Sequence, residues 1–268
     1  MTALVRWAPR LLGASLLVVV VLPLFALLLT SSPEELTKAF RSPAFAPAVL
    51  VSLKTSVVSL LLVVTAGIPL AWWLSRSQGR GPAWVLAILK LPIILPPAVI
   101  GLSLLLAFGV QSAIGGVLAR IGVVLPFSTA AVVLAQLVVA APFFVTAAAL
   151  GFAQIDNDTL LMARTLGSRP IYTFRHVILP LSLPTLISGA ALAWARALGE
   201  FGATLLFAGS FEGTTQTMPL AIYAALESDV GLARALALTL AAFALALLAL
   251  ARLVLYRPSQ QFPIAGGA

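Results

Sequence analysis

Few side chains in this sequence are able to do acid, base or metal chemistry. Cysteine is absent and the only histidine is His176. Disulfides, a cysteine nucleophile and a metal site built from several histidines are therefore excluded. His176 follows Arg175 in a charged stretch, where we expect an ordinary surface histidine and assign it no chemistry. Because no cluster of histidines or paired carboxylates is present, we expect neither an enzyme nor a metal site.

Two opposite charges interrupt one of the apolar runs. Arg196 and Glu200 are four residues apart, a spacing at which opposite charges meet on one helix face. A charge inside a membrane costs about 2.5 to 3.5 kcal/mol, so both side chains should face protein or water. One interpretation is an ion pair that holds the helix in its bundle. The other is that both residues, with Phe201, border a translocation path.

The composition indicates the class of protein in which these residues lie. Hydrophobic residues make up 61% of the 268 positions, charged residues 9%, and the mean hydropathy is +1.11. These values predict an all-α, polytopic membrane protein. The net charge of +8 comes from scattered lysines and arginines, and because they form no basic stripe we expect no nucleic-acid partner.

Runs of about 20 apolar residues predict six transmembrane helices in one domain, residues 1–268. The first run is longer than the core of a signal peptide, so we expect it to span the membrane. The six runs are approximately Leu11–Thr30, Thr55–Leu74, Ala83–Val110, Thr129–Gly151, Thr185–Ala208 and Ala235–Leu255.

The distribution of lysine and arginine predicts which side of the membrane each loop faces. Cytoplasmic loops carry the excess of these residues. With six spans, the side of both termini holds Arg6, Arg10, Arg76, Arg80, Lys90, Arg164, Arg169, Arg175, Arg252 and Arg257. The opposite side holds Lys38, Arg41, Lys54, Arg120 and Arg234. We therefore expect cytoplasmic termini, a cytoplasmic loop from Gly151 to Pro184, and an outer loop from Gly209 to about Leu232.

The third run contains Leu91-Pro-Ile-Ile-Leu-Pro-Pro97. Prolines remove backbone donors, so the helix must kink or unwind here. A membrane tolerates such a break only where protein or water surrounds it. Pro96 and Pro97 therefore shape the packing of the helices or line the path of a substrate.

The loop between the fourth and fifth spans predicts a helix, a tight turn and a second helix over about residues 156–180. Asp156, Asn157 or Asp158 is able to cap the first helix, and Gly167 to end it. The second helix should open around Ser168 and Pro170 and end at Pro180. The first helix has an apolar and a polar face, which suits either a partner's groove or the membrane interface.

This loop resembles the cytoplasmic coupling segment of ABC importer permeases. The family motif is roughly Glu-Ala-Ala, three residues, Gly, nine residues, Ile-x-Leu-Pro. Here Leu161-Met162-Ala163, Gly167 and Val177-Ile-Leu-Pro180 occupy its positions at the same spacing. The leading Glu is replaced by Leu161, and the nearest carboxylate is Asp158. By this resemblance, the residues that contact the ATPase are Asp158, Leu161, Met162, Ala163, Arg164, Thr165, Leu166 and Gly167.

The resemblance implies an inner-membrane homodimer with two ATP-binding cassette subunits and an extracytoplasmic binding protein. The sequence itself contains no P-loop, since none of its three lysines, Lys38, Lys54 and Lys90, follows a glycine. ATP and Mg²⁺ are therefore expected on the partner ATPase, with no cofactor in this chain.

Downstream, Ala197-Leu-Gly-Glu-Phe-Gly-Ala-Thr-Leu-Leu-Phe-Ala-Gly209 and Thr215-Gln-Thr-Met-Pro-Leu-Ala-Ile-Tyr223 resemble the molybdate and tungstate branch of these permeases. The sulfate branch, which shares part of this pattern, is the first alternative. A secondary transporter or channel without an ATPase is a more distant one, because Arg196 and Glu200 would then be the only midmembrane groups for coupling ions.

Overall fold

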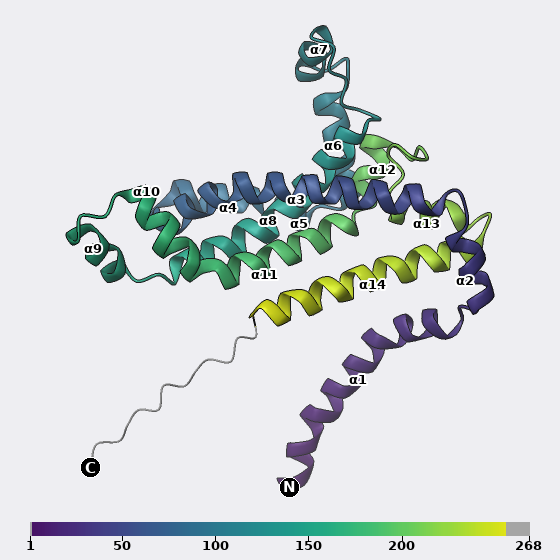
Figure 1. Ribbon diagram of the computed structural model, residues 1–268, viewed down its shortest axis with the longest axis horizontal. Coiled ribbons are helices and arrows are strands. Elements are labelled where there is room, and N and C mark those ends of the chain that lie inside the picture. The colour runs from purple at the N-terminus through teal and green to yellow at the C-terminus, as the bar shows by residue number, and fades with distance from the viewer. Residues whose placement is uncertain (1, 256–268) are drawn as a thin grey trace. The chain divides into compact units, whose positions relative to one another are not determined.

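The computed structural model describes residues 2–255, and all regular structure in this part of the chain is helical (Figure 1). The long helices are α1 (Thr2–Leu29), α3 (Phe45–Arg76), α8 (Thr129–Ala153), α11 (Leu179–Leu198) and α14 (Val230–Leu255). The shorter ones are α2 (Pro33–Phe40), α4 (Arg80–Leu89), α5 (Leu91–Ile94), α6 (Pro97–Phe108), α7 (Ala113–Arg120), α9 (Asn157–Thr165), α10 (Pro170–Thr173), the π-helix η1 (Phe174–Ile178), α12 (Gly202–Ala208) and α13 (Met218–Ala225).

The predicted number of membrane spans is confirmed. Within the described residues, five helices are long and apolar enough to cross a membrane, and a bent pair, Arg80–Ile94 with Pro97–Phe108, supplies a sixth candidate span. The break in this pair falls at Leu95 and Pro96, within the proline-rich stretch. The predicted kink is therefore confirmed, because the two helical pieces do not form one straight helix.

The chain packs as two compact units. Of the described residues, unit 1 contains 2–55, 97–135 and 198–243, and unit 2 contains 56–96, 136–197 and 244–255. In unit 2 the apolar core lies where α3, α8 and α11 pack together, with Phe144 and Phe152 fully buried. A Cβ atom on Gly67 of α3 would lie 2.7 Å from the Phe144 ring. The glycine therefore lets α3 approach α8 closely, which suits helix packing in a membrane.

In unit 1 the helices α6 and α12 lie against each other (Figure 1). The start of α13 is fixed to α3, because the backbone N–H of Met218 donates to Oγ of Ser52 at 2.6 Å. At another edge of this unit, Arg234 of α14 donates to Oε2 of Glu35 on α2 at 3.1 Å and to the carbonyl oxygen of Thr30 at 3.0 Å. These contacts connect segments that are far apart in sequence.

Several predicted helix ends are wrong. The second span starts at Phe45 instead of Thr55, and the sixth starts at Val230 instead of Ala235. Both helices are longer than the run of about 20 residues that a membrane requires, which is the length we searched for. The fifth span ends at Leu198 instead of Ala208. Residues 199–201 are not helical, and α12 is a separate helix.

Three short helices were not predicted, since counting apolar runs detects only long elements. Two of them have recognisable start signals. Ser32 accepts a hydrogen bond from the N–H of Glu35 at the start of α2, and Ser112 accepts one from Gly115 at the start of α7. The third, α13, opens with a proline at its second position.

Candidate coupling segment and membrane path

Helix α9 begins and ends at the residues that the sequence predicts. Asp156 is the N-cap and accepts a hydrogen bond from the N–H of Asp158 at 3.4 Å. At the other end, the N–H of Ser168 donates to the carbonyl oxygen of Ala163 and that of Gly167 to Arg164. Gly167 has φ of +75°. This is a Schellman ending, in which a residue in the left-handed region turns the chain away from the helix.

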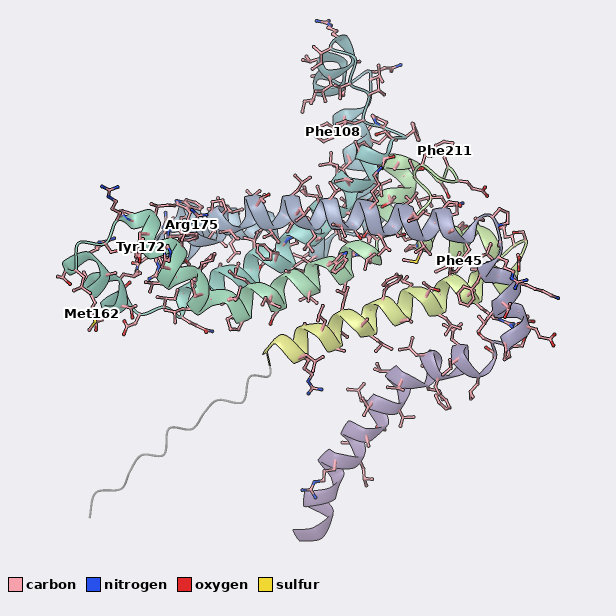
Figure 2. All side chains as sticks on the ribbon, in the orientation of Figure 1. Phe45, Phe108, Met162, Tyr172, Arg175 and Phe211 are labelled. Carbon is pink, nitrogen blue, oxygen red and sulfur yellow. The ribbon has the colours of Figure 1, made fainter. Side chains whose placement is uncertain are left out.

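The exposed side of α9 carries three large apolar side chains. Leu161, Met162 and Leu166 are 55%, 67% and 87% exposed, whereas Leu160 packs against the core of unit 2. Asp158, Arg164 and Thr165 are exposed too, and Ala163 is half-buried. Figure 2 shows Met162 on α9 at one end of unit 2. Apolar side chains held outward on a short capped helix are suited to a partner's groove.

The second helix of the segment starts as predicted but does not end as predicted. It begins at Pro170, with Arg169 as its N-cap. It does not stop at Pro180, because η1 carries it directly into α11. In η1 the N–H of Leu179 donates to the carbonyl oxygen of Phe174, five residues earlier. Pro180 has no N–H to donate, and the wider π turn accommodates it without ending the helix.

His176 lies on this second helix and is exposed. Its ring stacks on Tyr172 with centroids 4.1 Å apart, and Nδ1 lies 3.1 Å from the carbonyl oxygen of Tyr172. Among the described residues no group of three His, Cys, Asp or Glu side chains is placed to hold a metal ion.

The residues predicted to border a path divide between the two units. Pro96 and Arg196 belong to unit 2, whereas Pro97, Glu200 and Phe201 belong to unit 1. Because α11 ends at Leu198, Glu200 does not lie one helical turn beyond Arg196. The continuous helix that we expected from Arg196 to Glu200 is therefore wrong.

Instead, Glu200 is placed to start α12. It is 1% exposed, and its Oε1 accepts the backbone N–H of Ala203 at 2.8 Å. An acceptor at this position satisfies an amide that a helix start leaves without a partner. Sequence analysis missed this role, although the glycines at 199 and 202 on either side of Glu200 and Phe201 favour a break in the helix.

Unit 1 brings Pro97 close to Gly202, the residue after Phe201. A Cβ atom on Gly202 would lie 3.1 Å from Cβ of Pro97, so the proline at the start of α6 packs on the start of α12. Phe201 directly precedes Gly202 and contacts Tyr223, with ring centroids 5.3 Å apart. The start of α6 and the start of α12 therefore pack against each other within unit 1.

Multiple apolar spans with an exposed, capped helix-turn-helix between the fourth and fifth define the class of ABC importer permeases. Comparison with known proteins agrees with this class. Residues 63–259 match the family described as binding-protein-dependent transport system inner membrane component. The chain belongs to this family, whose members are transport components and not catalytic subunits.

Relatives with assigned names cover nearly the whole chain. The molybdenum transport system permease protein ModB of Mycobacterium tuberculosis is 42% identical over 89% of this chain and 90% of its own length. The ModB protein of Escherichia coli is 39% identical over 76% and 89%. A probable transport system permease protein, NifC of Clostridium pasteurianum, is 31% identical over 90% and 85%.

Solved structures support the fold. A bacterial ABC transporter that imports alginate aligns with a TM-score of 0.74 at 18% identity, covering 96% of this chain and 98% of that chain. The methionine transporter MetNI in an inward-facing form gives 0.59 at 16% identity, covering 79% and 94%.

Proposed function

We propose that this chain is the membrane permease of an ATP-driven importer for a tetrahedral oxyanion, molybdate or tungstate. The observation that carries this proposal is the 42% identity with a molybdenum permease across 89% of the chain. Further relatives at 38 to 41% identity also carry molybdenum in their names. The sequence stretch around Glu200, which resembles the molybdate branch, now has a structural role at the start of α12.

The energy comes from partner subunits in this proposal. Two ATP-binding cassette subunits bind ATP and Mg²⁺ and dock on α9, one on each copy of a permease homodimer. The exposed Leu161, Met162 and Leu166 supply apolar contact area for the ATPase groove. Leu161 stands in place of the motif's Glu, so docking depends on shape and apolar burial more than on an ion pair at that position.

An extracytoplasmic binding protein delivers the oxyanion. One related structure contains an alginate ABC transporter in complex with its periplasmic protein; it has a TM-score of 0.72 with this chain. The termini and α9 face the cytoplasm in this arrangement, and the loop containing α13 faces the binding protein. Specificity resides in the binding protein, because the membrane spans hold too few basic residues to surround a dianion.

The substrate is tested by competition. The chain is reconstituted in liposomes with its ATPase and binding protein, and uptake of labelled molybdate is measured with excess tungstate or excess sulfate. We expect tungstate to suppress uptake and sulfate to leave it unchanged. Preferred uptake of sulfate would retain the ABC class and overturn the substrate.

A further inference from the structure

One side chain, Arg76, joins three segments of unit 2. It is the last residue of α3. Its Nη2 donates to the carbonyl oxygens of Phe152 and Ile155 at 3.0 and 3.1 Å, and its Nη1 donates to Oδ1 of Asn157 at 2.9 Å. Phe152 lies in the last turn of α8, and Asn157 is the first residue of α9. Arg76 therefore binds the end of one membrane helix and the start of the coupling helix at the same time.

The chemistry of this contact requires arginine. The last carbonyls of a helix have no partner within that helix, and basic side chains are able to satisfy them. A guanidinium carries five N–H donors in a rigid fork and so reaches several oxygens together, whereas a lysine ammonium is a compact point charge on a flexible chain. The guanidinium also lies over the Trp72 ring, with Cζ 4.8 Å from its centroid, which fixes its orientation.

Helix α9 has few other attachments to the membrane helices. None of its residues is buried. A pocket of about 200 Å³ lined by Trp72, Leu160 and Arg164, among others, lies on one side of it. A second pocket of about 510 Å³ is lined by Arg76, Asn157 and Leu161, among others. The bond from Arg76 to Asn157 and the packing of Leu160 both attach α9 to the membrane helices.

The helices that Arg76 connects pack closely. The Trp72 ring meets the rings of Phe152 and Phe174 at 5.5 and 5.7 Å, edge to face. Together with the contact of Gly67 on Phe144, this packing holds α3 and α8 closely against each other. The guanidinium of Arg76 therefore connects the start of α9 to the end of α8 and to its own helix, α3.

We infer that Arg76 is a positioning residue that couples movement of α9 to α3 and α8. This inference rests on the proposed function, because it assigns how a movement imposed by the ATPase reaches the membrane. Arg76 touches neither ATP nor the transported ion. Its role is to keep the coupling helix from moving independently of the spans.

The first experiment tests, on the purified chain alone, whether Arg76 holds α9 in place against the membrane helices. The sequence has no cysteine, so cysteines replacing Gln78 and Met162, both exposed, take spin labels without other changes. The distance distribution between the labels is compared for Arg76, Arg76→Lys and Arg76→Gln. We expect one narrow distribution with Arg76 and clear broadening in both variants. An unchanged distribution would overturn the inference, whatever solute the protein transports.

The functional part is the number of ions taken up per ATP hydrolysed in the reconstituted complex. For Arg76→Lys we expect a fall of about tenfold, with ATP hydrolysis and the amount of bound ATPase retained. Asn157→Ala removes only the contact with α9 and should give a smaller fall.

Exposed Arg80 is the matched control, and Arg80→Lys should leave the ratio unchanged. A normal ratio in Arg76→Lys contradicts the inference, whereas absence of ATP-dependent uptake in the unaltered protein contradicts the proposed function instead.

Discussion

At the scale of single residues, Gly167 determines how the chain leaves α9. Its φ of +75° lies in the left-handed region, which costs an ordinary side chain roughly 1–2 kcal/mol. No heavy atom lies within 4 Å of a Cβ built on it. The cost of substitution is therefore conformational and not steric, which separates it from the tightly packed Gly67.

Because the cost of substitution at Gly167 is conformational, we predict different effects for two substitutions there. Gly167→Asn should retain coupled uptake, because asparagine tolerates the left-handed region. Gly167→Val, with a β-branched side chain, should reshape the turn and uncouple ATP hydrolysis from uptake. The measurement is uptake per ATP in the reconstituted complex. Normal uptake in Gly167→Val would remove our assignment of the turn.

Glu200 is the second residue with a specific structural role. Its carboxylate accepts the N–H of Ala203 inside protein. Glu200→Ala should lower the free energy of unfolding by about 1–2 kcal/mol, the usual cost of losing a helix cap. Glu200→Gln retains an acceptor oxygen and should lose less. Thermal unfolding of the purified chain checks this order, and equal loss in both variants would contradict it.

Sequence analysis identified roles that depend on neighbouring residues and missed roles that depend on partners far away in the sequence. Asp156 and Gly167 act on the helix next to them, so residue types limited the cap of α9 to three neighbouring positions and predicted its end at Gly167. Arg76 was assigned only to membrane topology, because its partner Asn157 is 81 residues away. Glu200 was assigned to a helix because the apolar run continues past it, and composition does not show that α11 stops at Leu198.

At the scale of elements, α9 is a short capped helix whose exposed side carries large apolar residues beside polar ones. Leu166 is 87% exposed at its last turn, although burying a leucine gains about 1.5–3 kcal/mol. A side chain of this kind held outward by a Schellman ending fits a surface that is covered in the complex. The helix therefore serves the proposed ATPase contact better than a solvated loop.

This argument predicts loss of assembly when the surface is charged. Leu166→Asp should reduce the ATPase retained on the purified permease by about tenfold or more, as for a central interface residue. Val230→Asp is the control, since Val230 is an exposed apolar residue at the start of α14 on the proposed outer side. The ATPase-to-permease ratio after affinity purification measures both. An unchanged ratio in Leu166→Asp would show that α9 does not dock the ATPase.

Whether a helix ends or continues at a proline was the hardest property to predict. The proline-rich stretch correctly indicated a break, because Pro96 and Pro97 follow each other. Pro180 was wrongly taken as a helix end, since one wide turn at η1 lets the helix continue into α11. Proline shows where a backbone donor is missing, but packing decides whether the helix ends or widens.

At the scale of the whole molecule, the orientation in the membrane remains a prediction from the charge distribution. Single cysteines in the otherwise cysteine-free chain provide a direct measurement. A cysteine at Met162 should react with a membrane-impermeant reagent only when the cytoplasmic side is open to it. A cysteine at Phe211, also exposed, should react from the outside. The reverse pattern would invert the proposed topology and place α9 out of reach of an ATPase.

The central claim is that ATP hydrolysis outside this chain drives the ion through it. Hydrolysis and molybdate uptake measured together in the same proteoliposomes, with and without loaded binding protein, test this most directly. The account predicts that loaded binding protein stimulates hydrolysis and that uptake stops without ATP. Molybdate flux that continues without ATP or the ATPase would contradict it and favour a secondary transporter or channel.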